Sequence, residues 1–303
     1  MSEATEKAYD FANIGNIVGT VESITNGKED GFKDIVFDKK IKHEDGKTEL
    51  KKTAAITGTL AVRVGDCTHY IKIFQNKYTK DGKDAKAYGM LVGLEVGDKI
   101  KITRVKLSPN EYYNSELELR TGIQHELVYN SQITMAGEKD AEEGRSVLEC
   151  VVLSEPIEDE HSGKTYITVG IVGYRGAITP IRLGSTEKVA SSLSSVDLHE
   201  TRKFTVGKVN KQVATAQECE SFGDDIDLAE FESGGQEYVI TGGSAQPIDE
   251  KELSPEEIAY GLKLHQDYLA NLREKQEEYL ANKGNQAGKP KTTVKVDKTK
   301  MDF

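Results

Sequence analysis

The chain has few of the cysteines that a disulfide framework needs and none of the long apolar runs that a membrane span needs. It has no tryptophan, six prolines and three cysteines in 303 residues. The cysteines form no CxxC pair and are odd in number, which favours a reducing, cytoplasmic setting over a disulfide framework. No run approaches the roughly 18 apolar residues of a membrane span, and residues 1–10 lack the apolar stretch of a secretion signal. We therefore expect a cytoplasmic protein that does not use a membrane.

Motifs of common catalytic sites are absent as well. The sequence contains no Walker A, GxGxxG, GxSxG or HExxH motif. Its six histidines are scattered without ligand spacing, and none neighbours a cysteine. The acidic stretch at residues 224–232 lacks the glycine and the distal glutamate of a calcium loop. These absences predict a protein that is not an enzyme and that uses no cofactor or metal.

The net charge of −11 is distributed unevenly along the chain. Residues 1–130 hold 20 basic and 20 acidic side chains, whereas residues 131–250 hold 10 and 22. Local charge, and not net charge, attracts phosphate. A nucleic-acid groove is therefore compatible with the first segment and disfavoured over the second.

Two stretches near residue 65 show the alternation of half-buried strands, residues 59–64 and residues 70–74. If the two isoleucines of the second stretch face the core, the opposite face carries two aromatic rings with a lysine between them. These outward residues are Tyr70, Lys72 and Phe74. Aromatic rings interleaved with cations on a sheet face suit stacked bases and a phosphate backbone.

Three more strands are predicted at residues 16–24, 99–103 and 116–120, the last with its two leucines buried. A short helix is expected at residues 85–94, and a loop with two adjacent tyrosines at residues 107–115. Five strands with a helix between the third and the fourth describe an OB barrel, whose ligand crosses strands 2 and 3 and the loops joining strands 1–2 and 4–5.

The connection between the first two strands contains a lysine-rich finger, which we define as residues 35–54. Its two arms form a hairpin with the tip near Asp45 and Gly46. Two interpretations stay open for its lysines: a solvated, solubilising surface or contact with phosphates.

The second segment repeats this order of elements after a polar linker at residues 131–145. Strands are predicted at residues 147–153, 166–174, 177–183, 204–209 and 238–241. Ser185 is the expected N-cap of a helix between the third and the fourth of these. The fold class is therefore mainly β, with tandem OB-like five-stranded barrels, a C-terminal α-helix and a flexible tail.

The C-terminal helix is predicted from a capping box, Ser254 to Glu257, and from a stop signal at Gly284. Its apolar stripe favours docking on a neighbouring domain or subunit. The predicted division is residues 1–130 for an OB-like nucleic-acid-binding domain and 131–250 for a second, acidic OB-like domain for interaction or oligomerisation. Residues 251–284 form the helix and residues 285–303 a flexible, lysine-rich tail.

The run LEVGDKIKITRVKLSPNEYYNSELELR, residues 94–120, resembles the closing hairpin of OB-fold single-stranded DNA-binding proteins. In them a Gly-Asp turn starts strand 4 and a long loop precedes strand 5. The resemblance covers roughly residues 16–128 and is closest to the divergent binders encoded by phages and mobile elements. It implies sequence-tolerant binding of single-stranded DNA in replication or recombination, in the host cytoplasm, with RNA as the alternative strand.

The tail carries a second, partial resemblance. Asp302 and Phe303 are similar to the acidic, Phe-ended tails through which such proteins recruit replication partners, whereas Lys295, Lys298 and Lys300 make this tail basic. Replication or recombination proteins and a second copy of the chain are the partner classes implied.

The candidate nucleic-acid-binding residues are Arg63, Tyr70, Lys72, Phe74, Lys77, Tyr78, Lys99, Lys101, Tyr112 and Tyr113. The alternative is that these aromatic rings cover an apolar face or a domain interface. The protein would then be a structural or assembly protein that uses OB-like domains for protein contacts.

Overall fold

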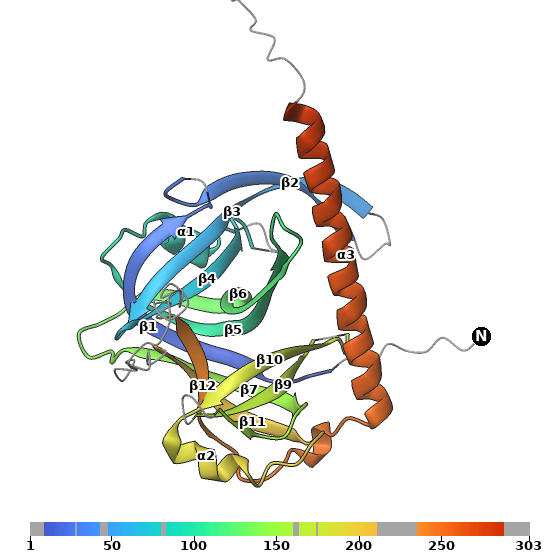
Figure 1. The fold of residues 1–303 in the computed structure, drawn as a ribbon. Helices are drawn as coiled ribbons and strands as arrows, with labels where there is room; N and C mark the ends of the chain where they lie inside the picture. The colour runs from blue at the N-terminus through green and yellow to red at the C-terminus, as the bar shows by residue number, and fades with distance from the viewer. Residues whose placement is uncertain are drawn as a thin grey trace, which may run out of the picture.

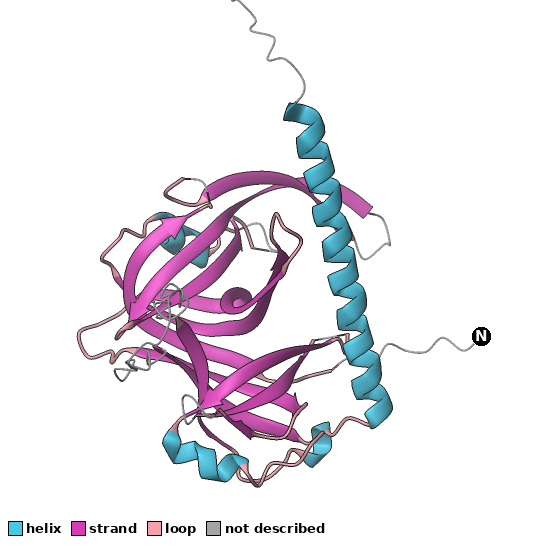
Figure 2. Ribbon diagram, in the orientation of Figure 1, coloured by secondary structure: helices cyan, strands magenta, loops and turns pink. Residues whose placement is uncertain are grey.

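The computed structural model describes residues 9–27, 29–42, 48–79, 83–159, 164–173, 175–210 and 235–287. Strands dominate these ranges, as Figure 2 shows, which confirms the prediction of a mainly β protein. Figure 1 shows two stacked barrels with one long helix running beside both.

The first barrel is a closed ring of five strands. Its strands are β1 (Asn13–Thr25), β3 (Thr48–Val64), β4 (Cys67–Asn76), β5 (Lys99–Tyr113) and β6 (Leu119–Met135). They pair in the order β1-β3-β4-β6-β5-β1, and only the β4–β6 pair in this ring is parallel. The helix α1 (Lys86–Val92) connects β4 to β5, and β2 (Lys33–Lys42) pairs with the long strand β3 outside the ring.

The second barrel repeats this topology. Its strands are β7 (Glu143–Val152), β9 (Thr165–Val172), β10 (Ile178–Ser185), β11 (Thr201–Asn210) and β12 (Gln236–Gly243). They close in the order β7-β9-β10-β12-β11-β7, with β10 and β12 parallel. The short strand β8 (Ile157–Glu158) pairs with β9, and α2 (Glu187–Leu193) connects β10 to β11. The strand pairings confirm tandem OB-like five-stranded barrels.

Strand β1 changes partners along its length. One of its edges pairs first with β7, from Asn13 to Val18, and then with β3, from Thr20 to Thr25. Gly19 lies at the change, where a Cβ atom would stand 2.1 Å from the carbonyl oxygen of Arg63. Only glycine allows the two backbones to approach this closely.

Each barrel has its own apolar core, built from residues that alternate along the strands. In the first barrel Ile71 and Ile73 are fully buried, while Tyr70 and Phe74 on either side of them are half exposed. The predicted facing of this strand is therefore confirmed. In the second barrel Leu148 and Ile167 belong to the equivalent core.

The β5–β6 hairpin corrects two expectations. Residues 107–113, expected as a loop, continue β5, and residues 116–120, expected as a buried strand, contain the hairpin turn. Leu117 has a φ of 60°, and Leu119 is 38% exposed. The hairpin extends beyond the barrel, so its alternating leucines have no core to face.

The connections differ from the sequence expectation at three other points. Residues 131–135 belong to β6 and place Ile133 in the first core, so the linker is shorter than expected and covers residues 136–142. Helix α2 has Thr186, and not Ser185, as its N-cap, because Ser185 ends β10. The domain boundaries at residues 130 and 250 stay predictions.

Helix α3 (Pro255–Ala287) begins with the predicted capping box and continues past Gly284. The backbone N–H of Ser254 donates to Glu257 at 3.0 Å, and that of Glu257 donates to the Ser254 hydroxyl at 3.2 Å. Gly261 lets the helix approach the second barrel, since a Cβ there would lie 2.4 Å from the Gly176 carbonyl oxygen.

The same helix reaches the first barrel at the β5–β6 hairpin. His265 Nε2 lies 2.9 Å from a carboxylate oxygen of Glu111, with both side chains largely buried. Farther along, the Gln276 amide donates to the Asn114 carbonyl at 3.2 Å. The predicted docking of the helix on neighbouring domains therefore involves both barrels.

No helix within the described ranges combines the length and the apolar character that crossing a membrane requires. The tip of the lysine-rich finger, the acidic stretch at residues 224–232 and the tail with Asp302 and Phe303 lie outside the described residues.

The burial pattern of β4 yields a stability prediction. Ile71→Ala and Ile73→Ala should each lower the free energy of unfolding by about 2–5 kcal/mol, because each leaves a cavity in a closed core. Lys72→Ala, between them on the exposed face, is the matched control and should change it by less than about 0.5 kcal/mol. Denaturant unfolding of the three variants measures this, and equal losses at all three positions would contradict the assigned facing.

Candidate nucleic-acid interface

The outward face of β3 and β4 carries the centre of the predicted site. Tyr70 pairs with Ala61, Lys72 with Thr59 and Phe74 with Thr57, so small partners on β3 leave the β4 side chains standing clear. Tyr70 is 52% and Phe74 50% exposed, with Lys72 exposed between them. We call Tyr70, Lys72 and Phe74 the β4 face.

Strand β2 adds an aromatic residue that the sequence analysis did not single out. The rings of Phe37 and Phe74 lie 5.8 Å apart at a tilt of 51°. Phe37 pairs with Thr53 on β3, and Phe74 pairs with Thr57 on the same strand. Thr53 and Thr57 are separated by an even number of positions, so Phe37 and Phe74 stand on the same side of the sheet. In the sequence it is hidden within the lysine-rich finger, where the charges dominate the pattern.

Lys77 and Tyr78 follow directly after β4, at the Phe74 end of the face. The ammonium of Lys77 lies 5.5 Å from the centre of the Tyr78 ring. The backbone N–H of Lys77 donates to the Ala54 carbonyl at 2.9 Å, which ties this segment to β3. The structure thus brings five of its aromatic and cationic candidates together along one strand and its continuation.

Arg63 lies toward the other end of the face, opposite Thr68. Its guanidinium forms an ion pair with Glu22, which also accepts a hydrogen bond of 2.6 Å from the Thr68 hydroxyl. The bonds from Thr68 and Arg63 lower the pKa of the Glu22 carboxyl, so this acid stays ionised beside the arginine. Arg63 is therefore partly neutralised within the protein.

Lys99 and Lys101 are not brought to the β4 face. Both lie on β5 and bind Asp140 of the linker: Lys101 Nζ lies 2.8 Å from the carboxylate, and Lys99 Nζ donates to the backbone carbonyl at 3.1 Å. The hydrogen bond from Lys101 is the largest cause of the lowered pKa of Asp140. These two lysines therefore secure the connection between the barrels.

Tyr112 and Tyr113 lie at the tip of the β5–β6 hairpin, paired with Arg120 and Leu119. Tyr112 is 52% exposed, and the adjoining Asn114 receives the hydrogen bond from helix α3. These tyrosines form a separate group beside α3.

Lys208 of the second barrel joins the site and was not among the sequence candidates. Its ammonium donates to the Thr68 carbonyl and lies 5.4 Å from the centre of the Tyr70 ring. Burial lowers the pKa of this lysine. Sequence pattern offers no signal for it, because its neighbours lie about 140 residues away along the chain.

A pair of buried histidines, His69 and His125, lies close to the contact between the two barrels. His69 and His125 are almost fully buried, and their rings lie 5.3 Å apart. His125 lies 3.3 Å from the Ser146 hydroxyl and 3.4 Å from the Tyr238 hydroxyl, whereas Nδ1 of His69 has no hydrogen-bond partner among the described residues. Burial lowers the pKa of His69 to about 4 and that of His125 to about 3.

Among the described residues, no group of three or more His, Cys, Asp or Glu side chains could hold a metal ion. The chemistry available at the β4 face is stacking, cation attraction and hydrogen bonding.

Residues 13–278 match the protein-family model described as YorF. None of the curated proteins matches the chain. A solved structure of a deletion mutant of the single-stranded DNA binding protein from Thermus aquaticus superposes with a TM-score of 0.39 at 11% sequence identity, covering 66% of this chain and 87% of that one. A TM-score of this size is too low to carry an argument about the present chain.

The buried histidine pair makes stability depend on pH. The ordinary pKa of 6.5 applies in the unfolded chain, so the unfolded state takes up protons below that pH while the folded state does not until about pH 4. The stabilising effect of the pair should therefore be fully present above about pH 6.5, and by about pH 5 the free energy of unfolding should fall by about 2 kcal/mol for each histidine, or about 4 kcal/mol for the pair. Thermal unfolding across this range measures the effect.

A double variant, His69→Gln with His125→Gln, should flatten this dependence even if it is less stable throughout. The exposed His199 provides the control, and His199→Asn should retain the slope of the unaltered chain. A slope that survives the double substitution would show that other groups cause the acid sensitivity.

Proposed function

The chain belongs to the YorF family, and we propose that its first barrel binds single-stranded DNA by stacking bases on the β4 face. One observation carries this proposal. Tyr70 and Phe74 are half exposed on a strand whose intervening isoleucines are fully buried. Two large rings held in water by a rigid barrel offer a stacking surface at little cost in conformational entropy.

The arrangement of cations supports the same proposal. Lys72 lies between the two rings, Lys77 follows at one end, and Lys208 approaches Tyr70 at the other. Phosphates alternate with bases along a strand, so cations beside stacking rings can neutralise the backbone. The net negative charge of the chain does not oppose this, because local charge determines the attraction.

The proposal is specific for unpaired strands and tolerant of sequence. Stacking uses the flat surface that every base has, and that surface is inaccessible within a duplex. DNA is the proposed ligand, with RNA as the alternative that the same face accommodates. Single strands are exposed during replication and recombination, which places the proposed role, and any partner proteins, in these processes.

The first test compares single-stranded with duplex oligonucleotides of equal length and sequence. We expect tighter binding of the single strand, and Tyr70→Ala and Phe74→Ala should each weaken it by about 1–3 kcal/mol. Tyr260→Ala, at an exposed tyrosine of α3, is the control and should leave affinity unchanged. Fluorescence anisotropy measures the affinities, and melting temperatures verify folding.

Equal affinity for both nucleic-acid forms, or no affinity for either, would contradict the proposal. If Tyr70→Ala and Phe74→Ala weakened binding of a partner protein and left nucleic-acid affinity unchanged, the result would instead support the assembly alternative.

Salt dependence provides a second, independent test. For single strands, log K falls with log salt by about 0.7 for each phosphate neutralised, so Lys72→Ala should make the slope shallower by about that amount. Arg63→Ala should change the slope less, because Glu22 already pairs with that guanidinium. Lys263→Ala on α3 is the charge-matched control, and a slope for Lys72→Ala equal to that control would rule out a phosphate contact at Lys72.

A further inference from the structure

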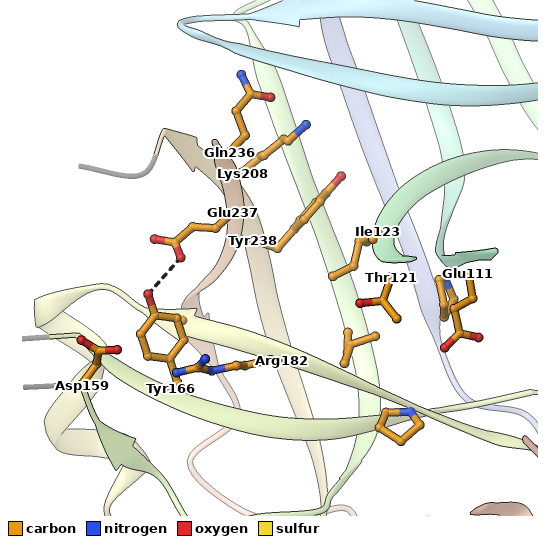
Figure 3. A pocket seen from close by; sticks show the side chains of 15 residues that line it. Glu111, Thr121, Ile123, Asp159, Tyr166, Arg182, Lys208, Gln236, Glu237 and Tyr238 are labelled. Carbon is orange, nitrogen blue, oxygen red and sulfur yellow. Dashed lines mark hydrogen bonds between the residues drawn. The ribbon is translucent and has the colours of Figure 1, made fainter. Parts of the chain in front are cut away.

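A cleft of about 620 Å³ lies between the two barrels, next to the β4 face. Figure 3 shows its two walls: the β5–β6 hairpin of the first barrel contributes Thr121 and Ile123, and strands of the second barrel contribute Tyr166, Arg182 and Tyr238. Neither barrel alone forms this cleft. It lies against β9 and β10, the second and third strands of the second barrel.

The second-barrel wall contains a stacked pair of planar groups. The Arg182 guanidinium carbon lies 4.1 Å from the centre of the Tyr166 ring. The Tyr166 hydroxyl donates to Glu237 at 3.1 Å, drawn as the dashed line in Figure 3, and Lys164 pairs with the same carboxylate. The ring is therefore held in place, and bases stack on both aromatic rings and guanidinium planes.

Lys208 links the cleft to the β4 face. Its ammonium lies 5.4 Å from the centre of the Tyr70 ring and 5.8 Å from that of the Tyr238 ring, and both Lys208 and Tyr238 line the cleft. The Thr68 carbonyl accepts one of its three N–H groups, so other donors of this cation can serve a phosphate. A strand leaving Tyr70 would meet this cation first.

The acidic residues of the cleft limit what it can hold. Of its three carboxylates, Glu237 is bound by Lys164 and Tyr166, and Glu111 lies against His265, while Asp159 is the third. A lining of mixed charge disfavours a run of phosphates and suits a neutral base.

We propose that this cleft takes the continuation of the bound strand, with a phosphate at Lys208 and one base stacked on the Tyr166–Arg182 pair. The proposal rests on single-strand binding at the β4 face and assigns the second barrel a direct part in it. The acidic second barrel then contributes through a few placed side chains and not through its net charge.

Strand length separates the two contacts. An OB barrel covers roughly 4–16 nucleotides, so we would measure the affinity of the full chain for oligothymidines from about 6 to about 30 nucleotides. Arg182→Ala and Tyr166→Leu should each weaken binding of the long strands by about fivefold or more and leave the shortest strand unaffected. Tyr166→Phe, which keeps the ring, should lose less than Tyr166→Leu. Tyr70→Ala should weaken binding at every length.

Arg175→Ala is the matched control, because it removes the same charge from an exposed position of the same barrel outside the cleft. Long-strand binding by Arg182→Ala and Tyr166→Leu that equals the Arg175→Ala control, alongside a loss in Tyr70→Ala, would overturn the cleft proposal and leave the β4 face intact. Absence of binding by the unaltered chain at every length would overturn both.

Discussion

The hydrogen bonding of strand β1 is the constraint on which the rest of the molecule depends. One edge of β1 pairs with β5, and the other is divided between β7 and β3. The same strand therefore closes the first barrel and joins the second to it. The division is possible because Gly19 allows β1 to cross β3 at a distance that no side chain tolerates.

The position of the second barrel follows from this pairing, and it creates features that neither barrel has alone. Lys208 is placed beside Tyr70, the two histidines are enclosed, and a cleft opens between the β5–β6 hairpin and β10. Helix α3 spans the same junction through Gly261 and His265. A mixed set of charges at the junction is tolerated because Glu237 and Glu111 have Lys164 and His265 as partners.

The proposed function relies on a rigid barrel that holds exposed rings and cations in fixed positions. Closed barrels have few free edges and well-packed cores, so their outward side chains stand in defined positions. Stacking rings on such a surface bind any sequence of bases. Cations beside the rings neutralise phosphates, so the affinity falls as the salt concentration rises. An overall acidic chain can work in this way because screening confines electrostatic attraction to roughly the nearest 10 Å.

The sequence by itself determined what depends on local periodicity. Alternation with period two placed Ile71 and Ile73 inside and Tyr70 and Phe74 outside, because a strand turns each successive side chain to the opposite face. The capping box of α3 and the order of strands and helices in both barrels were also readable, since they rest on neighbours in the chain. Tertiary structure alone decided which strands pair and which distant residues meet. Phe37 beside Phe74, Lys101 on Asp140 and Lys208 beside Tyr70 each join segments far apart in sequence. Such contacts depend on register and barrel closure, for which residue spacing carries no signal.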